Sequence, residues 1–321
     1  MSSMVYDRGS MKSIGLVLIL FAPGLFAQQP APKHLKTSKA PLELAITFDD
    51  LPAHGPLPPG VTRMEVAKKI VHALKDAHLP PTYGFANGLG VERQPADIGV
   101  LRLWQDAGNP LGNHTWSHMN LNQHTVDEFE ADVERNEPIL KQLMDKGDWH
   151  WFRFPFLAEG ETPEKHDAVH AFLGERGYKI AAVTMSFADY SWNEPYARCV
   201  AKNDRKAIGV LETSYLSAAE ENITFYRTLS QSLFHRDIPY VLLMHIGAFD
   251  AEMLPRLLDL YRTKGFEFIP LGQAESDDFY KVDTEIHGPT GPDSLEGLAT
   301  ERHIPFPPRT SYDRQLESVC Q

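Results

Sequence analysis

Short apolar runs alternate with longer amphipathic stretches through the middle of this chain, and this alternation constrains the fold more than any other feature. The runs suit β-strands, and the stretches between them repeat apolar residues with helical spacing. Strands are expected at 44–48, 82–86, 110–113, 151–154, 180–185, 240–244 and 266–269, and helices at 62–77, 126–144, 163–176, 219–235 and 251–264. This order predicts an α/β fold with about seven parallel strands and crossover helices, closed as a barrel rather than left as an open sheet.

The first 27 residues have the pattern of a secretory signal peptide. Lys12 precedes an apolar run at 14–26, and Ala27 offers a small residue at the cleavage site. The run is too short for a convincing membrane span, although an uncleaved hydrophobic anchor is the alternative interpretation. We therefore expect an exported protein, periplasmic or secreted, with a signal peptide at 1–27, a proline-containing linker at 28–41 and no stable membrane span after cleavage.

The charge distribution excludes two classes of partner. The chain has a formal net charge of −12 at pH 7, and its lysines and arginines form no basic stripe that could neutralise phosphates. Nucleic acids and anionic membrane surfaces are therefore not expected as partners.

The alternation of strands and helices ends near residue 280. We therefore expect one domain at 42–280, followed by an extended tail at 281–321 that contains many glycines and prolines. The two cysteines, Cys199 and Cys320, are too few for a disulfide scaffold or a four-thiolate metal site. In an oxidising compartment they could pair and tie the tail to the domain, and the sequence leaves this open.

Polar side chains stand at the ends of four expected strands. Asp49 and Asp50 follow the first strand, His114 follows the third, Arg153 lies near the end of the fourth, and His245 follows the sixth. Because the carboxyl ends of parallel strands open on one face of a barrel, we expect these side chains to meet there. The sequence therefore predicts one polar site built from distant segments.

This predicted site includes candidate metal ligands. His114 and His118 are four residues apart, a spacing that places two imidazoles on one face of a helical turn. With one of the two aspartates they would supply three ligands and leave room for water and substrate, while the other aspartate could act as a base. Taken alone, the aspartate pair could be a helix N-cap, and one histidine pair is weak evidence in a chain with 14 histidines.

Two residues, Arg153 and Asp189, could support this chemistry. Arg153 could orient Asp49 and keep it ionised, and Asp189, which follows the fifth expected strand, could keep His245 protonated. The alternatives are a surface ion pair for Arg153 and a core position for His245. His54 lies close in sequence to the two aspartates, but no role is assigned to it.

Five segments together resemble a known family. They are TFDD at 47–50, HTWSH at 114–118, RFPF at 153–156, DYSW at 189–192 and LMH at 243–245. In this order they resemble the motifs of the polysaccharide deacetylases, the NodB-homology domain of carbohydrate esterase family 4, over about residues 42–272. The resemblance implies a distorted (β/α) barrel with fewer than eight complete strands, and one divalent metal ion, usually zinc and sometimes cobalt.

The resemblance also implies roles for individual residues. The metal ligands would be Asp50, His114 and His118, the catalytic base Asp49, the acid His245, and the residue that orients the base Arg153. The backbone N–H near Phe156 would help to bind the oxyanion, and Trp192 and Leu243 would shape the acetyl pocket. The third motif ends in Phe-Leu where the family commonly has Tyr-Gly, and the fourth lacks the usual Asp-Trp pair, so both departures touch the substrate groove.

The activity that the resemblance implies is hydrolysis of N-acetyl groups on an amino-sugar polysaccharide or oligosaccharide, with release of acetate. The same residues would serve an O-acetyl xylan esterase or a hydrolase of small cyclic amides or imides. A carbohydrate-binding protein without catalysis is the non-enzymatic alternative. The sequence does not choose among peptidoglycan, chitin-like oligomers and poly-N-acetylglucosamine, and it indicates no oligomeric state.

Overall fold

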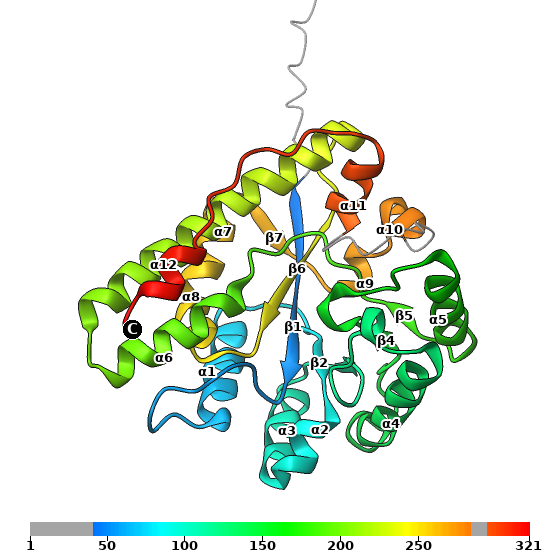
Figure 1. The fold of residues 1–321 in the computed structure, drawn as a ribbon, viewed down its shortest axis with the longest axis horizontal. Helices are drawn as coiled ribbons and strands as arrows, with labels where there is room; N and C mark the ends of the chain where they lie inside the picture. The colour runs from blue at the N-terminus through cyan, green and yellow to red at the C-terminus, as the bar shows by residue number, and fades with distance from the viewer. Residues whose placement is uncertain (1–40, 284–293) are drawn as a thin grey trace, which may run out of the picture. The chain divides into compact units, whose positions relative to one another are not determined.

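Seven parallel strands form a sheet at the centre of residues 41–283 and 294–321, the parts of the chain that the computed structural model describes (Figure 1). The strands are β1 (Leu42–Leu51), β2 (Gly84–Ala86), β3 (Leu111–Asn113), β4 (Trp151–Phe152), β5 (Lys179–Ile180), β6 (Tyr240–His245) and β7 (Phe266–Phe268). Their order is β5-β4-β3-β2-β1-β6, and β7 pairs with the first residues of β1. The expected signal peptide and all of the expected linker except Pro41 lie outside the described residues.

The sheet curls so that the chain beyond β5 reaches the edge strand β6. Met185 forms an isolated parallel bridge with Leu242, and the N–H of Thr184 donates to the carbonyl of Val241 at 3.1 Å. An α/β fold with a curled parallel sheet, the distorted barrel that was expected, is therefore confirmed. The expected strand at 180–185 is wrong in length, because β5 ends at Ile180 and the residues near 184 pair with β6 instead of continuing beside β4.

Helices connect the strands and surround the sheet in Figure 1. They are α1 (Arg63–Asp76), α2 (Gly88–Arg93), α3 (Ile98–Asp106), α4 (Val126–Met144), α5 (Pro163–Glu175), α6 (Asn193–Ala201), α7 (Arg205–Phe234), α8 (Ala248–Thr263), α9 (Leu271–Ala274) and α10 (Asp278–Asp283). The helices expected at 62–77, 126–144, 163–176 and 251–264 are confirmed to within three residues at each end. Within the described residues, no helix combines the length and the apolar character needed to cross a bilayer.

The helix expected at 219–235 is too short, because α7 begins at Arg205. Asp204 caps its first turn by accepting a hydrogen bond from the N–H of Ala207 at 2.9 Å. The buried stripe of the helix already includes Leu211 and Tyr215, so the apolar face that packs on the domain starts before residue 219.

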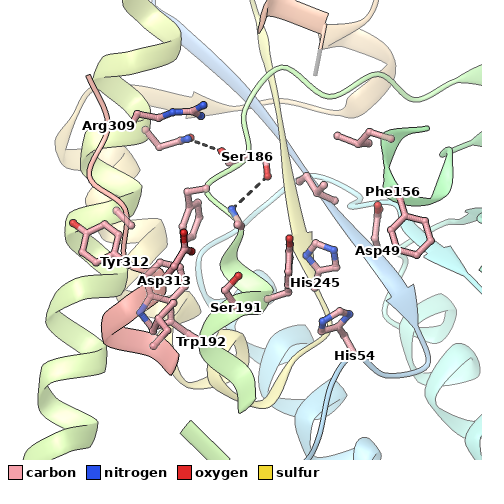
Figure 2. Close-up of a pocket in the computed structure, with 18 of the residues that line it drawn as sticks. Asp49, His54, Phe156, Ser186, Ser191, Trp192, His245, Arg309, Tyr312 and Asp313 are labelled. Carbon is pink, nitrogen blue, oxygen red and sulfur yellow. Dashed lines mark hydrogen bonds between the residues drawn. The ribbon is translucent and has the colours of Figure 1, made fainter. Parts of the chain in front are cut away.

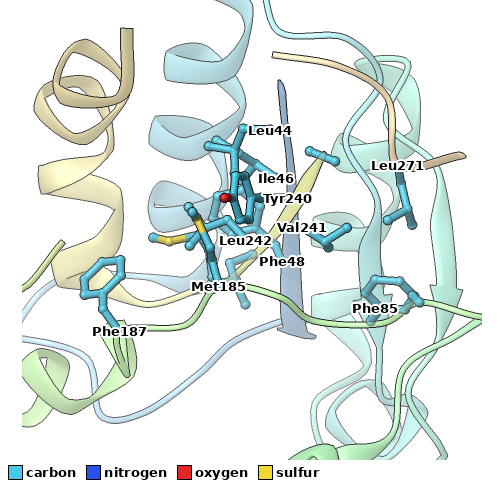
Figure 3. Packing of buried hydrophobic residues seen from close by; sticks show 14 of the residues in the cluster. Leu44, Ile46, Phe48, Phe85, Met185, Phe187, Tyr240, Val241, Leu242 and Leu271 are labelled. Atoms are coloured by element: carbon cyan, nitrogen blue, oxygen red, sulfur yellow. The ribbon is translucent and has the colours of Figure 1, made fainter. Parts of the chain in front are cut away.

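The hydrophobic core centres on the two longest strands, β1 and β6. Leu44 and Phe48 of β1 and Tyr240 and Leu242 of β6 are fully buried (Figure 3). Every residue of β6 is buried, as expected for a parallel strand covered on both faces. The parallel register of these strands therefore holds their polar carboxyl ends at a fixed place beside an apolar interior.

The described part of the C-terminal segment is not simply extended, as was expected, because it contains α11 (Ser294–Glu301) and α12 (Asp313–Ser318). Helix α11 packs on α7. A disulfide joins Cys199 in α6 to Cys320, so the pairing that the sequence left open is present. Arg198 adds hydrogen bonds to the carbonyls of Leu316 at 2.7 Å and Val319 at 3.2 Å. These contacts attach the end of the chain to the domain.

Candidate metal centre and active site

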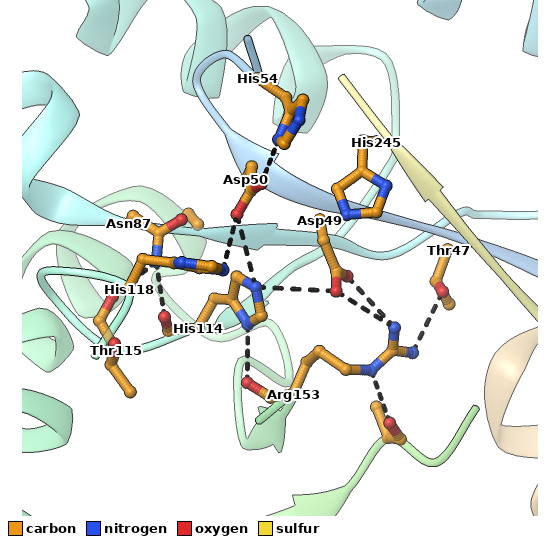
Figure 4. A network of polar contacts seen from close by, with 12 residues as sticks. Thr47, Asp49, Asp50, His54, Asn87, His114, Thr115, His118, Arg153 and His245 are labelled. Atoms are coloured by element: carbon orange, nitrogen blue, oxygen red, sulfur yellow. Dashed lines mark hydrogen bonds and ion pairs between the residues drawn. The ribbon is translucent and has the colours of Figure 1, made fainter. Parts of the chain in front are cut away.

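The predicted polar residues meet at the carboxyl ends of the strands (Figure 4). Asp49, near the end of β1, lies directly opposite His245, the last residue of β6, in the parallel register of the two strands. His114 follows β3, and Arg153 follows β4. Segments far apart in the sequence therefore build one site, as the strand ends predicted.

Asp50, His114 and His118 form a cluster of potential metal ligands. Oδ1 of Asp50 lies 3.5 Å from Nε2 of His114 and 3.2 Å from Nε2 of His118. One ligand atom from each residue lies within 4.8 Å of the other two. Oδ1 of Asp50 is buried and has no hydrogen-bond partner among the described residues. A carboxylate oxygen and two imidazole nitrogens that converge in this way suit a divalent cation and leave a coordination position open.

The protonation states of Asp50 and His118 also suit a cation. Although burial acts to raise it, the neighbouring imidazoles of His114 and His54 hold the pKa of Asp50 well below its usual value. Burial lowers the pKa of His118 to about 4, and the nearby His114 adds to this effect. Nδ1 of His114 donates to the carbonyl of Arg153 at 2.7 Å, which leaves Nε2 as the ring nitrogen that faces Asp50. The cluster therefore presents an ionised Asp50 carboxylate beside a neutral His118 imidazole.

The two histidines meet through a loop rather than through the helical turn that was expected. Thr115 and His118 have φ angles of 58° and 59°, in the left-handed region, so residues 114–118 do not form a helix. The side-chain amide of Asn87 donates to the carbonyls of His114 at 2.5 Å and Thr115 at 3.1 Å. Because Asn87 holds this loop, it keeps a backbone that the four-residue spacing alone would not predict.

Arg153 is buried behind Asp49 and is not the surface ion-pair partner that was the alternative. Its side chain is 1% exposed, and Nη1 lies 3.2 Å and 3.4 Å from the two carboxylate oxygens of Asp49. Nη2 donates to Oγ1 of Thr47 at 3.1 Å, and Nε donates to the carbonyl of Ala181 at 2.6 Å. These bonds hold the guanidinium in one position, and the guanidinium in turn orients the carboxylate.

His245 is held by Asp189 in the 3₁₀ turn η4 (Asp189–Trp192). The Asp189 carboxylate accepts hydrogen bonds from the backbone N–H of His245 at 2.7 Å and from its Nδ1 at 2.9 Å. Burial acts to lower the pKa of His245, but the adjacent Asp189 carboxylate outweighs it and raises the pKa to about 10. His245 is therefore a charged imidazolium at neutral pH rather than an ordinary core histidine.

His54 is part of the site, although no role was assigned to it from the sequence. Its Nδ1 lies 2.5 Å from Oδ2 of Asp50, the oxygen that does not face His114 and His118. Its ring lies 4.8 Å from the ring of His245, between centroids. Its place four residues after Asp50 was the available signal, but the direction of its side chain depends on the bond from its backbone N–H to the carbonyl of Ile246.

A cavity of about 650 Å³ opens beside the cluster (Figure 2). The predicted substrate-binding residues Phe156, Trp192 and Leu243 all line it. Phe156 is 63% exposed, and its ring lies 4.4 Å from the ring of His118. Of the predicted residues, Arg153 and Asp189 do not line the cavity. They lie behind residues that do.

The C-terminal segment forms the opposite wall of the cavity, which the sequence did not predict. Arg309 and Tyr312 lie on one side in Figure 2, and Asp49 and Phe156 lie on the other. Glu221 of α7 holds this segment by accepting hydrogen bonds from the N–H of Thr310 at 3.2 Å and the hydroxyl of Tyr312 at 3.1 Å. No local pattern in the glycine- and proline-containing tail indicates this position.

Comparisons with known proteins agree with the geometry of the site. A family model described as polysaccharide deacetylase matches residues 36–195. The peptidoglycan-N-acetylglucosamine deacetylase of Bacillus cereus is 32% identical over 101 residues, and this stretch spans 32% of each chain. The remaining two thirds of that relative is therefore not matched.

Solved structures show the same fold. The chitin deacetylase of the fungal pathogen Colletotrichum lindemuthianum superposes with a TM-score of 0.51 at 19% identity, over 74% of this chain and 88% of that chain. A CE4 family pseudoenzyme from Bacillus anthracis superposes with a TM-score of 0.50 at 14% identity, over 73% of this chain and 66% of that chain. The family match, the curled parallel sheet and the motif residues at its strand ends together identify the chain as a member of the polysaccharide deacetylase family, CE4.

Proposed function

We propose that this protein is a metal-dependent hydrolase that removes N-acetyl groups from an amino-sugar polysaccharide or oligosaccharide and releases acetate. One observation carries the proposal. The ligand cluster of Asp50, His114 and His118 is complete, and a second buried carboxylate, Asp49, has an oxygen 3.6 Å from Nε2 of His114. The partial match to a peptidoglycan-N-acetylglucosamine deacetylase supports an amino-sugar substrate.

Asp50, His114 and His118 are the residues that would hold a divalent ion, zinc or cobalt. Imidazole nitrogens with one carboxylate are common zinc ligands, and three protein ligands are typical of a catalytic rather than a structural site. When bound, the ion would supply an activated water and polarise the acyl oxygen.

Asp49 is the proposed general base. Because Arg153 bonds to its carboxylate, Asp49 is held in one orientation. Its carboxylate accepts a proton from the attacking water as the water oxygen bonds to the acetyl carbon.

His245 is the proposed general acid. Since Nδ1 is bonded to Asp189, Nε2 is the ring atom left to donate a proton. It gives this proton to the amide nitrogen as the C–N bond breaks, and acetate and a free amino sugar leave. Phe156 through its backbone N–H is proposed to bind the oxyanion, and Trp192 and Leu243 to shape the acetyl pocket that they line.

Acetate release tests this proposal. Full-length protein loaded with zinc should release acetate from N-acetylglucosamine oligomers, and a chelator should stop the release. Asp49→Asn should retain zinc but lower turnover by about 10²–10⁴-fold, because an amide cannot accept the proton. Acetylated xylan and a small cyclic imide serve as comparison substrates. Faster hydrolysis of either one, or full activity of Asp49→Asn, would contradict the proposal.

Export is also part of the proposal. The signal-like pattern at 1–27 and the disulfide between Cys199 and Cys320 both suit an oxidising compartment such as the periplasm or the cell exterior. Fractionation of cells that express the full chain, with amino-terminal sequencing of the exported form, tests it. Recovery of the uncleaved chain in the cytoplasm would contradict it.

A further inference from the structure

A further cluster of potential metal ligands lies outside the cavity, at the start of α5. His166 and His170 are four residues apart on this helix, and Glu159 lies in the loop that leads into it. Oε2 of Glu159 is 3.0 Å from Nε2 of His170 and 3.9 Å from Nε2 of His166. One ligand atom from each residue lies within 4.8 Å of the other two, and none of the three residues lines the cavity.

The two rings lie side by side on one face of α5. Residues four apart on a helix lie on the same face, and the two imidazoles stack with centroids 3.8 Å apart and planes at 22°. His166 is buried at 2% exposure, whereas the side chains of His170 and Glu159 are 15% and 35% exposed. An ion could therefore reach the cluster from solvent and keep a water as a further ligand.

The hydrogen bonding of His166 supports an ion at this place. Nδ1 of His166 lies 3.2 Å from Oδ1 of Asp167, and since a carboxylate can only accept, Nδ1 carries the proton. The other ring nitrogen, Nε2, faces Oε2 of Glu159 at 3.9 Å. A carboxylate on the far ring nitrogen is also the usual partner of a metal-binding histidine.

We propose that Glu159, His166 and His170 bind one zinc-type divalent ion, separate from the catalytic cluster. Two imidazoles and one carboxylate favour zinc or a neighbouring transition metal over magnesium or calcium, which prefer oxygen ligands. This proposal stands on its own contacts and does not depend on the deacetylase activity.

An ion here would join the loop after β4 to α5. That loop includes η3 (Pro155–Leu157), and Phe156 in η3 lies at the rim of the cavity beside His118. At the start of the loop, Phe154 stacks on His170 with centroids 5.5 Å apart. The ion would therefore stabilise the rim of the cavity without touching the reacting atoms.

Zinc content measured in a set of four proteins tests the inference. Full-length wild type, Asp50→Ala, His170→Gln and the double variant are stripped with a chelator, equilibrated with zinc chloride, desalted and analysed by mass spectrometry of the metal. We expect about two equivalents in wild type, one in each single variant and none in the double variant. His72→Gln is the matched control, because His72 pairs with Asp76 at the same four-residue spacing but has no second histidine. It should retain two equivalents.

Thermal unfolding gives a second readout. Zinc should raise the Tm of Asp50→Ala, because an ion that binds only the folded state stabilises it, and this rise should be absent when Glu159→Gln is added. If wild type binds one equivalent that Asp50→Ala removes and His170→Gln does not, the second site is overturned and the catalytic one stands. If His170→Gln removes the single equivalent and Asp50→Ala does not, the second site stands and the proposed catalytic site fails.

Discussion

At the scale of single residues, the contact between Asp189 and His245 predicts a pH dependence for the proposed mechanism. The Asp189 carboxylate raises the pKa of His245 to about 10, so the imidazolium is present below that pH and is lost as the pH rises through it. Asp189→Asn keeps the shape but removes the charge, so the pKa of His245 should fall. The high-pH limb of kcat/KM should therefore move to lower pH, as a pH–rate profile would measure. A high-pH limb that stays in place would exclude His245 as the acid.

His54 offers a second prediction at this scale. Its bond to Oδ2 of Asp50 fixes the carboxylate and leaves Oδ1 to face His114 and His118. Loss of such an outer partner typically weakens metal binding by about 10–100-fold. We expect His54→Ala to show this loss in a zinc competition titration, and His54→Asn, which can still donate, to recover part of it. The titration is made in a His170→Gln background, so that only the cluster of Asp50, His114 and His118 is measured. If His54→Ala has the same zinc affinity as the parent protein in that background, His54 does not support the metal site.

At the scale of elements, two glycines predict opposite responses to the same substitution. A Cβ on Gly112 of β3 would lie 2.7 Å from the carbonyl oxygen of Trp151 and 2.6 Å from the ring of Phe85. Gly112→Ala should therefore destabilise the sheet by about 1–3 kcal/mol. Gly209 of α7 has nothing within 4 Å of its added Cβ, so Gly209→Ala should stabilise the protein by about 0.5–1 kcal/mol. Urea unfolding of both variants measures the two changes in the free energy of unfolding. Equal changes in the two variants would contradict the tight packing of β3 against β4.

At the scale of the whole molecule, the disulfide between Cys199 and Cys320 connects positions 121 residues apart. A disulfide that closes such a long loop reduces the conformational entropy of the unfolded chain, and this stabilises the folded protein by up to about 4–5 kcal/mol. The Cys199→Ser/Cys320→Ser double variant should therefore unfold at lower urea concentration. It should also raise KM for glycan, because residues 309–313 and Leu316 line the cavity wall. A reductant should lower wild-type stability but leave the double variant unchanged. Wild-type and double-variant midpoints that coincide without reductant would contradict this role.

The sequence by itself determined the features that depend on neighbouring residues. Apolar strands followed at once by Asp49, His114 and His245 required those side chains to meet, because parallel strands end on one face. The apolar periodicity of α4 and the capping box at Thr125 and Glu128 also depend only on nearby residues. The bounds of α4 agree with the expected helix at 126–144. Fold class, strand number and the convergence of these side chains were therefore predictable.

Only the tertiary structure decided features that depend on contacts between distant segments. The direction of the His54 side chain depends on a hydrogen bond from its backbone N–H to Ile246. Strand β5 is short because the residues that follow it pair near Val241. The cavity wall depends on the hydrogen bond from Tyr312 to Glu221 of α7. The non-helical loop that joins His114 to His118 rests on Asn87. None of these contacts leaves a pattern in the residues beside it, since each is a hydrogen bond made only when the sheet has curled and brought its partner near.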